Sequence, residues 1–180
     1  MGLTLVTATL PSRAHLLAEM QASVSRQTLR PMAHVIRWDH GGGFVDTVNA
    51  AVASVTTDYF CLVDDDDLLL PEHVATLVEH LTADIVWTFC RVIGRDGWDP
   101  NSGYQPGLLQ SRNYIPSNMA MRTSLWRDLG GYRSVGHADH PDWDLLRRAE
   151  QAGATFRNVP TVTWEYRFHG ANMSLGGIHA

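Results

Sequence analysis

The sequence has few cysteines, no long apolar run and no glycine-rich loop near its start, and each absence narrows the class of protein. Its two cysteines, Cys61 and Cys90, both lie in apolar, strand-like stretches. They indicate buried free thiols in a reducing compartment rather than a disulfide framework. No stretch approaches the roughly 18 apolar residues of a membrane span, and the start MGLTLVTATLPSR is not a signal peptide. We therefore expect a cytoplasmic protein without a membrane span.

Positive charge is also scarce. The chain has 14 Lys and Arg against 19 Asp and Glu, a net charge of −5, so it offers no basic field for general nucleic-acid binding. Binding of a small phosphate ligand through a bridging metal ion remains compatible with this charge. The length of 180 residues, with 44% hydrophobic and 18% charged residues, predicts a single globular domain over residues 1–180. Its glycine-rich end, from about residue 170, predicts a flexible tail.

Strand and helix patterns alternate along the chain. Strands are expected at residues 3–10, 34–38, 59–63 and 84–94, with a strand pair within 155–168, and helices at 12–27, 45–55, 71–81 and about 141–152. This alternation implies βαβ units, hence an α/β fold with a mostly parallel central sheet flanked by helices. Residues 95–113 carry turn residues throughout and predict a long loop that is functional or mobile.

Four consecutive aspartates, in the stretch CLVDDDDLLLP, follow the third expected strand. Ligands of α/β sheets bind at the carboxyl ends of strands, and crowded carboxylates favour a nearby cation. In an extended chain Asp64 and Asp66 would point one way, and Asp65 and Asp67 the other. Such an alternating pair suits Mg²⁺ or Mn²⁺ with a substrate phosphate. The alternative is that Asp66 or Asp67 caps the following helix while the others are solvated.

Several segments in this order and spacing resemble the inverting family 2 glycosyltransferases. The similar segments are TLPSRAHLLAEMQASVSRQT, WDHGGG, VNAAVASVTTDYFCLVDDDDLLLPEHV, LGGY and PDWDLLRRAEQAG. The resemblance extends from Leu3 to about Ser174 and implies the GT-A (nucleotide-diphospho-sugar transferase-like) fold. It also implies a hexosyltransferase-type enzyme. In that family the acidic cluster at the strand end is the DxD motif, which holds a metal and the diphosphate of a nucleotide-sugar.

The resemblance also implies roles for individual residues. Asp66 would be the principal metal ligand with Asp64 beside it, and Asp64 and Asp65 would contact ribose, diphosphate or metal-bound water. The residues expected to contact the nucleoside are Thr9, Pro11, Ser12, Arg13 and Asp39. His169 follows the last strand, where such enzymes often place a further metal ligand; the alternative is an exposed histidine at a strand end. The chain departs from the family in TLPSR, which lacks a tyrosine for stacking on the base.

An inverting transfer needs a base for the acceptor hydroxyl and charge neutralisation of the departing diphosphate. The element PDWDLL resembles the family's base-bearing segment, and the aspartate in the base position is Asp142, with Asp139 as the fallback. Asp144 lies two residues further on, where a helix turns its side chain to another face. The alternative for Asp142 is an acid in the first turn that complements the helix dipole.

These features together predict a metal-dependent inverting glycosyltransferase that moves a sugar from a nucleotide-sugar to an acceptor hydroxyl. We expect Mn²⁺ or Mg²⁺ as the cofactor and a UDP-sugar as the favoured donor, with a GDP-sugar as the second choice. Two alternatives remain: a nucleotide-sugar-binding module without turnover, and a nucleotidyltransferase, although TLPSR lacks the glycines of that class. Trp98 and Tyr104, in the long loop, are candidates for stacking on a sugar.

Overall fold

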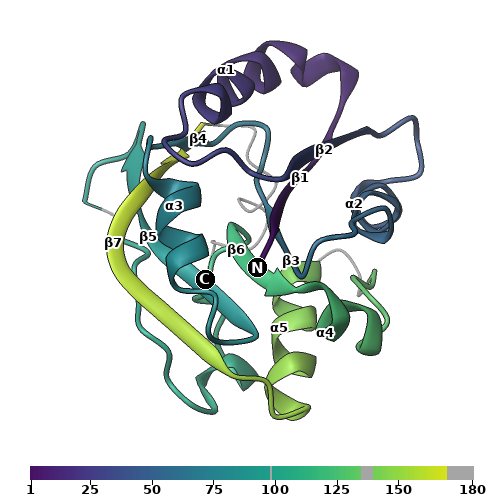
Figure 1. Cartoon of the computed structure of the whole chain (residues 1–180), viewed down its shortest axis with the longest axis vertical. Coiled ribbons are helices and arrows are strands. Elements are labelled where there is room, and N and C mark those ends of the chain that lie inside the picture. Colours follow the sequence, from purple (N-terminus) through teal and green to yellow (C-terminus); the bar gives the residue numbers. More distant parts are fainter. Residues whose placement is uncertain (98, 135–139, 170–180) are drawn as a thin grey trace.

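The computed structural model describes residues 1–97, 99–134 and 140–169 (Figure 1). In this part of the chain the strands are β1 (Leu3–Thr9), β2 (Ala33–Trp38), β3 (Tyr59–Leu62), β4 (Leu68–Leu69), β5 (Ile85–Ile93), β6 (Met119–Arg122) and β7 (Phe156–Arg167). The helices are α1 (Ala14–Ser25), α2 (Phe44–Ala53), α3 (His73–Glu79), α4 (Thr123–Asp128) and α5 (Pro141–Gln151), with 3-10 turns η1 (Pro11–Arg13) and η2 (Leu108–Gln110). Trp98, Asp139 and the expected tail from about residue 170 lie outside the described residues.

The strands form one curled sheet in the order β2-β1-β3-β6-β5-β7-β4, in which β7 traces a long arc (Figure 1). β1 is parallel to both β2 and β3, as the βαβ pattern predicts. β6 lies antiparallel between β3 and β5, because the chain reaches it through a loop and not through a helical crossover. The α/β architecture is confirmed, and the sheet is mixed rather than mostly parallel.

The expected strand pair near the C-terminus is a single strand, β7. It runs parallel to β5, and the register shifts on both sides of Phe89, so that Thr88 is opposite Val159 while Phe89 is opposite Val162. Pro160 lies between Val159 and Val162, in the stretch of β7 that has no partner residue on β5. Proline has no N–H for the ladder, so the strand bulges there and continues. A strand pair was expected here, and the structure corrects that expectation to one bulged strand.

Two hydrophobic clusters cover the two faces of the sheet. Along β3 the side chains alternate, with Phe60 in the cluster that includes α2 and α5, and Cys61 in the cluster that includes α1 and α3. Cys61 and Cys90 are both buried and free, as the sequence predicts. Among the described helices, none has the length and apolar character needed to cross a membrane.

His73, the first residue of α3, is a buried histidine with 0% of its surface exposed. Its Nδ1 lies 2.8 Å from the hydroxyl oxygen of Thr163, and burial lowers the pKa of His73 to about 3. Burial likewise lowers the pKa of His34 to about 4. Both histidines therefore stay neutral in the folded chain at pH values where the unfolded chain becomes protonated.

The free energy of unfolding should fall as the pH decreases from about 6.5 towards these folded-state pKa values, because the unfolded chain then binds more protons. We expect His73 alone to account for about 1.5 kcal/mol between pH 6.5 and pH 5. Urea denaturation across this range should show a smaller acid-dependent loss in His73→Leu than in the wild type. The exposed His15→Gln serves as the control and should keep the wild-type slope; equal slopes in all three proteins would contradict the prediction.

Candidate active site

The four aspartates lie in a turn that begins directly after β3. The backbone N–H of Asp67 donates to the carbonyl oxygen of Asp64 at 3.2 Å, so the chain is not extended here and the expected alternation of side chains is wrong. The helix-cap alternative is also wrong, because α3 begins only at His73 and the carboxylate of Asp67 accepts a hydrogen bond from the backbone N–H of Arg167 at 3.1 Å. The carboxylate of Asp67 thus points to β7, whereas Asp65 and Asp66 share Arg13 as a partner.

Asp65 and Asp66 both face the carboxyl end of β1. They are only 4% and 7% exposed. Thr9, the last residue of β1, donates its hydroxyl to Asp65 at 2.5 Å. Arg13 reaches back from η1 and lies 2.7 Å from the other oxygen of Asp65, while the same guanidinium nitrogen also pairs with Asp66. Burial raises the pKa of Asp65, and the bonds from Thr9 and Arg13 oppose that rise.

The local sequence explains why Arg13 points at the aspartates. Pro11 begins the η1 turn, a position at which its fixed backbone angle is favourable, and the N–H of Arg13 closes the turn onto the carbonyl of Leu10 at 2.9 Å. Ser12 lies exposed on the same turn. Burial lowers the pKa of Arg13, but the charges of Asp66 and Asp65 outweigh it and raise the pKa overall. The guanidinium therefore remains charged.

His169 comes to the same place from the end of β7. Its Nε2 lies 3.0 Å from Asp66 Oδ2. The preceding Phe168 is held by its N–H, which donates to the carbonyl of Ile93 at 2.8 Å. Gly94 permits this approach, because a Cβ at that position would lie 2.3 Å from the carbonyl oxygen of Phe168. A cleft of about 550 Å³ opens beside the pair; it is lined by Ser12, Arg13, His15, Leu16, Arg167 and His169.

The side chains at this cleft have the donor chemistry for a divalent cation, but they do not form a ready-made site. Carboxylate and imidazole groups suit Mn²⁺, and carboxylates suit Mg²⁺. Asp67 Oδ2 is buried and has no hydrogen-bond partner among the described residues. Across residues 1–97, 99–134 and 140–169, however, no three His, Cys, Asp or Glu side chains converge as a metal centre. Asp66 Oδ2 contacts Arg13 and His169, so a cation there requires rearrangement.

Asp142 belongs to a different element, helix α5. It lies in the first turn of α5, and its Oδ1 accepts a hydrogen bond from the N–H of Trp143 at 2.8 Å. Burial raises the pKa of Asp142. Burial, followed by the charge of Asp66, raises the pKa of Asp64 to about 7, and the charges of Asp65 and Asp142 add to the rise, while the hydroxyl of Ser117 opposes it. Asp64 and Asp142 are therefore close enough to sense each other's charge.

Three further residues belong to this part of the site. Ser117 donates its hydroxyl to Asp64 at 2.9 Å, and the side chain of Asn113 acts to lower the pKa of Asp142. Burial and then the charges of Asp142 and Asp64 raise the pKa of the buried Tyr132. None of the three was expected from the sequence. The motif LGGY offered a signal for Tyr132, because its paired glycines indicate a constrained backbone.

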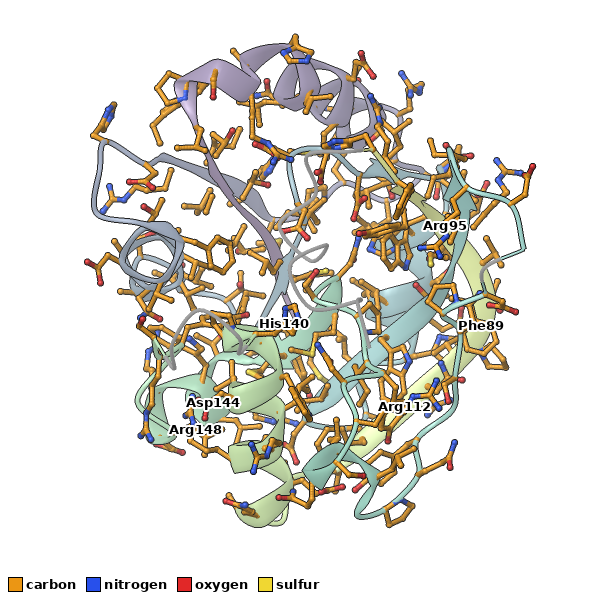
Figure 2. All side chains as sticks on the ribbon, turned by 180° about the vertical axis from the view of Figure 1, so that it is seen from behind. Phe89, Arg95, Arg112, His140, Asp144 and Arg148 are labelled. Carbon is orange, nitrogen blue, oxygen red and sulfur yellow. The ribbon has the colours of Figure 1, made fainter. Side chains whose placement is uncertain are left out.

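That constrained backbone is fixed by α5 and α2. Asp144 pairs with Arg148 at 2.8 Å (Figure 2), and Arg148 donates to the carbonyls of Leu129 and Gly131, both at 2.7 Å. Asn49 bonds the carbonyl and the N–H of Tyr132, both at 2.9 Å. Asp142 and Asp144 thus have different surroundings: Asp142 faces the acidic cluster, while Asp144 supports the loop that positions Tyr132.

Asp39 lies at the same edge of the sheet but bonds within its own turn. Its Oδ1 accepts hydrogen bonds from the N–H groups of Gly41 and Gly43, at 2.8 and 3.1 Å, and these bonds lower its pKa. Its backbone N–H donates to the carbonyl of Thr9 at 2.7 Å. Asp39 therefore organises the link from β2 to α2 next to the carboxyl end of β1.

The loop before β6 is anchored to α5 over part of its length. Tyr104 stacks on Phe156 with ring centroids 4.5 Å apart and donates its hydroxyl to Glu150 at 2.9 Å. Glu150 also accepts bonds from the N–H of Gly107 at 3.0 Å and from Gln110 at 2.8 Å. One face of Tyr104 is therefore used for packing, and stacking of Tyr104 on a sugar stays a prediction.

Replacing Glu150 with alanine should release this loop, because three donors lose one charged acceptor. We expect a loss of about 1 to 2 kcal/mol in stability and faster amide hydrogen exchange over residues 103–110. Gln151→Ala is the matched control, since Gln151 makes a single neutral bond to Gln110 at 3.1 Å and should have a smaller effect. Unchanged exchange in Glu150→Ala would show that the loop is held by packing alone.

The acidic turn at the end of β3 and the half-buried Asp142 of α5 lie in the part of an α/β fold where glycosyltransferases carry their acidic residues, and the family comparison agrees with this. The chain belongs to glycosyl transferase family 2, whose family model matches residues 14–139. This assignment confirms the family resemblance predicted from the sequence.

Two curated relatives are similar in sequence. The uncharacterized glycosyltransferase YwdF of Bacillus subtilis (strain 168) is 26% identical over 196 residues, which cover 89% of this chain and 72% of that protein. The uncharacterized protein y4gI of Sinorhizobium fredii (strain NBRC 101917 / NGR234) is 28% identical over 126 residues, which cover 66% of this chain and 14% of that protein.

Solved structures of S. aureus TarS share the fold. TarS 1-349 in complex with UDP-GlcNAc has a TM-score of 0.75 and 12% identity, over 97% of this chain and 61% of that chain. TarS 1-349 in complex with UDP has a TM-score of 0.71 and 13% identity, over 93% of this chain and 61% of that one. This chain therefore spans about 61% of the TarS chains it matches. The likeness confirms the GT-A fold.

Proposed function

We propose that this chain catalyses the metal-dependent, inverting transfer of a sugar from a nucleotide-sugar to an acceptor hydroxyl. The observation that carries the proposal is that the half-buried Asp142, in the first turn of α5, is close enough to Asp64 for its charge to raise the pKa of Asp64. Membership of glycosyl transferase family 2 supports it. A UDP-sugar is the favoured donor, in keeping with the TarS complexes with UDP-GlcNAc and UDP; a GDP-sugar is the second choice.

In the proposed reaction Asp142 takes the proton of the acceptor hydroxyl while the hydroxyl oxygen forms a bond to the anomeric carbon. The bond from that carbon to the diphosphate oxygen breaks, and its electron pair leaves with the diphosphate. A single displacement of this kind inverts the anomeric centre. Burial raises the pKa of Asp142, which makes its carboxylate a stronger proton acceptor than a solvated aspartate.

The donor would bind across the carboxyl ends of β1, β2 and β3. Thr9, Pro11, Ser12 and Asp39 would contact the nucleoside, and Asp65 would lie at the diphosphate. Arg13, which the family resemblance placed at the nucleoside, would instead lie at the diphosphate, because it pairs with Asp65 and Asp66. The lining of the cleft by Arg13, Arg167 and His169 suits an anion. A Mn²⁺ or Mg²⁺ ion held by Asp66, Asp64 and His169 would supply charge neutralisation for the departing diphosphate.

The proposal is tested by calorimetric titration of UDP, GDP and dTDP into the purified chain, with and without Mn²⁺. We expect one nucleotide to bind at least tenfold more tightly with Mn²⁺, and Asp66→Ala to lose this binding while the exposed Asp128→Ala keeps it. Sugar release from the matching nucleotide-sugar is then measured. Binding without release would favour the binding module without turnover, and a folded chain that binds no nucleotide would overturn the proposal.

A further inference from the structure

We propose that Arg13 is the counter-cation of the aspartate turn in the nucleotide-free protein, and that metal and nucleotide bind cooperatively because Arg13 must leave Asp66 for the diphosphate. This inference rests on the proposed function for its diphosphate partner. Its structural basis is the guanidinium itself, which contacts Asp65 and Asp66 together within a largely buried cluster.

The contacts of Asp66 leave no lone pair on Oδ2 for a further partner. A carboxylate oxygen offers about two acceptor directions, and at Oδ2 these are used by Arg13 and by His169, which lies 3.0 Å away. A divalent cation bound through Oδ2 would compete with the guanidinium for that atom. Bound through either oxygen of Asp66, the cation would lie close to the guanidinium, and their like charges repel.

Arginine cannot resolve this competition by losing its proton, since its side chain stays charged in proteins. It has to move. A metal ion that arrives alone therefore displaces Arg13 from two buried carboxylates without giving it a new anion, and an unpaired charge in a buried position is unfavourable. Binding of the metal by itself should consequently be weak.

A diphosphate removes this obstacle, because a guanidinium binds phosphate oxygens as readily as carboxylate oxygens. The neighbouring cleft of about 550 Å³, which Arg13 itself lines, provides space for the new partner. The Nε of Arg13 is buried and donates to no other described residue, so one donor is unused in the nucleotide-free arrangement. Phosphate binding would let Arg13 use its Nε–H as a donor. The coupling is reciprocal: each of the two ligands, metal and nucleotide, then increases the affinity for the other.

The test compares the affinity of the wild type for Mn²⁺ with that of its Arg13 variants, each as the full chain and without nucleotide. Binding is followed through the electron paramagnetic resonance signal of free Mn²⁺. Arg13→Gln should bind Mn²⁺ alone at least tenfold more tightly than the wild type, and Arg13→Lys should fall between them. Arg30→Gln, an exposed arginine, serves as the control and should match the wild type. The same titrations with UDP present should show strong coupling in the wild type and weak coupling in Arg13→Gln.

The stability of each variant is checked by its melting temperature with and without Mn²⁺. If Arg13→Gln is destabilised by its unneutralised carboxylates, Mn²⁺ should raise its melting temperature more than that of the wild type. Equal affinity of Arg13→Gln and the wild type for Mn²⁺ alone, with UDP binding to the wild type intact, overturns the inference and leaves the proposed function standing. Absence of binding of UDP, GDP and dTDP to the folded wild type overturns the proposed function and the diphosphate step of the inference together.

Discussion

Asp142→Asn is expected to lower the rate of sugar release by about 10²- to 10⁴-fold, the contribution usual for a positioned general base. Asparagine keeps an oxygen that accepts the hydrogen bond from the N–H of Trp143, so the first turn of α5 should be preserved. Nucleotide binding should stay within about twofold of the wild type, since general-base catalysis acts on the transition state rather than on ground-state binding. The measurement is release of UDP from UDP-GlcNAc and UDP-glucose, with water as the acceptor.

Asp144→Asn provides the matched control on the same helix. It removes the ion pair with Arg148, so it should lower the melting temperature by a few degrees while keeping the catalytic rate within about threefold. The opposite result, with Asp144→Asn inactive and Asp142→Asn active, would assign the base to Asp144. Loss of nucleotide binding in Asp142→Asn would instead place that residue in the donor site.

Gly131→Ala should destabilise the fold by about 2 to 4 kcal/mol, from the backbone angle and the steric clash together. Gly131 has φ +74°, and a Cβ there would lie 2.8 Å from Asn49 Oδ1 and 3.0 Å from the Trp126 ring. Asn49 holds both backbone groups of Tyr132, so moving it disturbs the site as well. Urea denaturation measures the loss of stability, and the sugar-release assay measures the loss of rate.

Gly153→Ala separates the two causes. Gly153 has a similar φ of +79° with nothing within 4 Å of the added carbon, so it should lose only about 1 kcal/mol from the backbone angle. The difference between the two variants then isolates the clash with Asn49 and Trp126. If Gly131→Ala costs no more than Gly153→Ala, the contact with Asn49 yields to the added methyl group and the tight packing of the loop is not required.

The sequence was informative wherever structure follows from local pattern. The alternation of apolar segments predicted β1, β2, β3 and β5 with small errors at their ends, because period and turn residues are local properties. The position of the aspartates at the end of β3 followed in the same way from the buried run before them. The single bulged strand β7 was expected as a strand pair, because Pro160 breaks the ladder in either arrangement and only the partner strand distinguishes the two.

The hydrogen-bond partners of the aspartates could not be predicted from local sequence pattern. Asp67 is bonded by the backbone of Arg167, which lies 100 residues further along the chain, and Asp64 is bonded by Ser117, 53 residues away. Such contacts depend on where the antiparallel strand β6 enters the sheet. The turn at residues 64–67 could not be predicted from local sequence either. A run of identical side chains has no hydrophobic periodicity, so it does not distinguish a turn from a strand.

The cleft beside Asp66 joins residues from opposite ends of the sequence, and this determines when it forms during synthesis. Arg13 and the aspartate turn emerge early from the ribosome, whereas Arg167 and His169 follow about 100 residues later, at about 5 to 20 residues per second. Until then Asp67 lacks its bond from Arg167 and β5 lacks its parallel neighbour β7. A nascent chain without β7 therefore has no complete cleft, and we expect ligand binding only once the last described strand has been made.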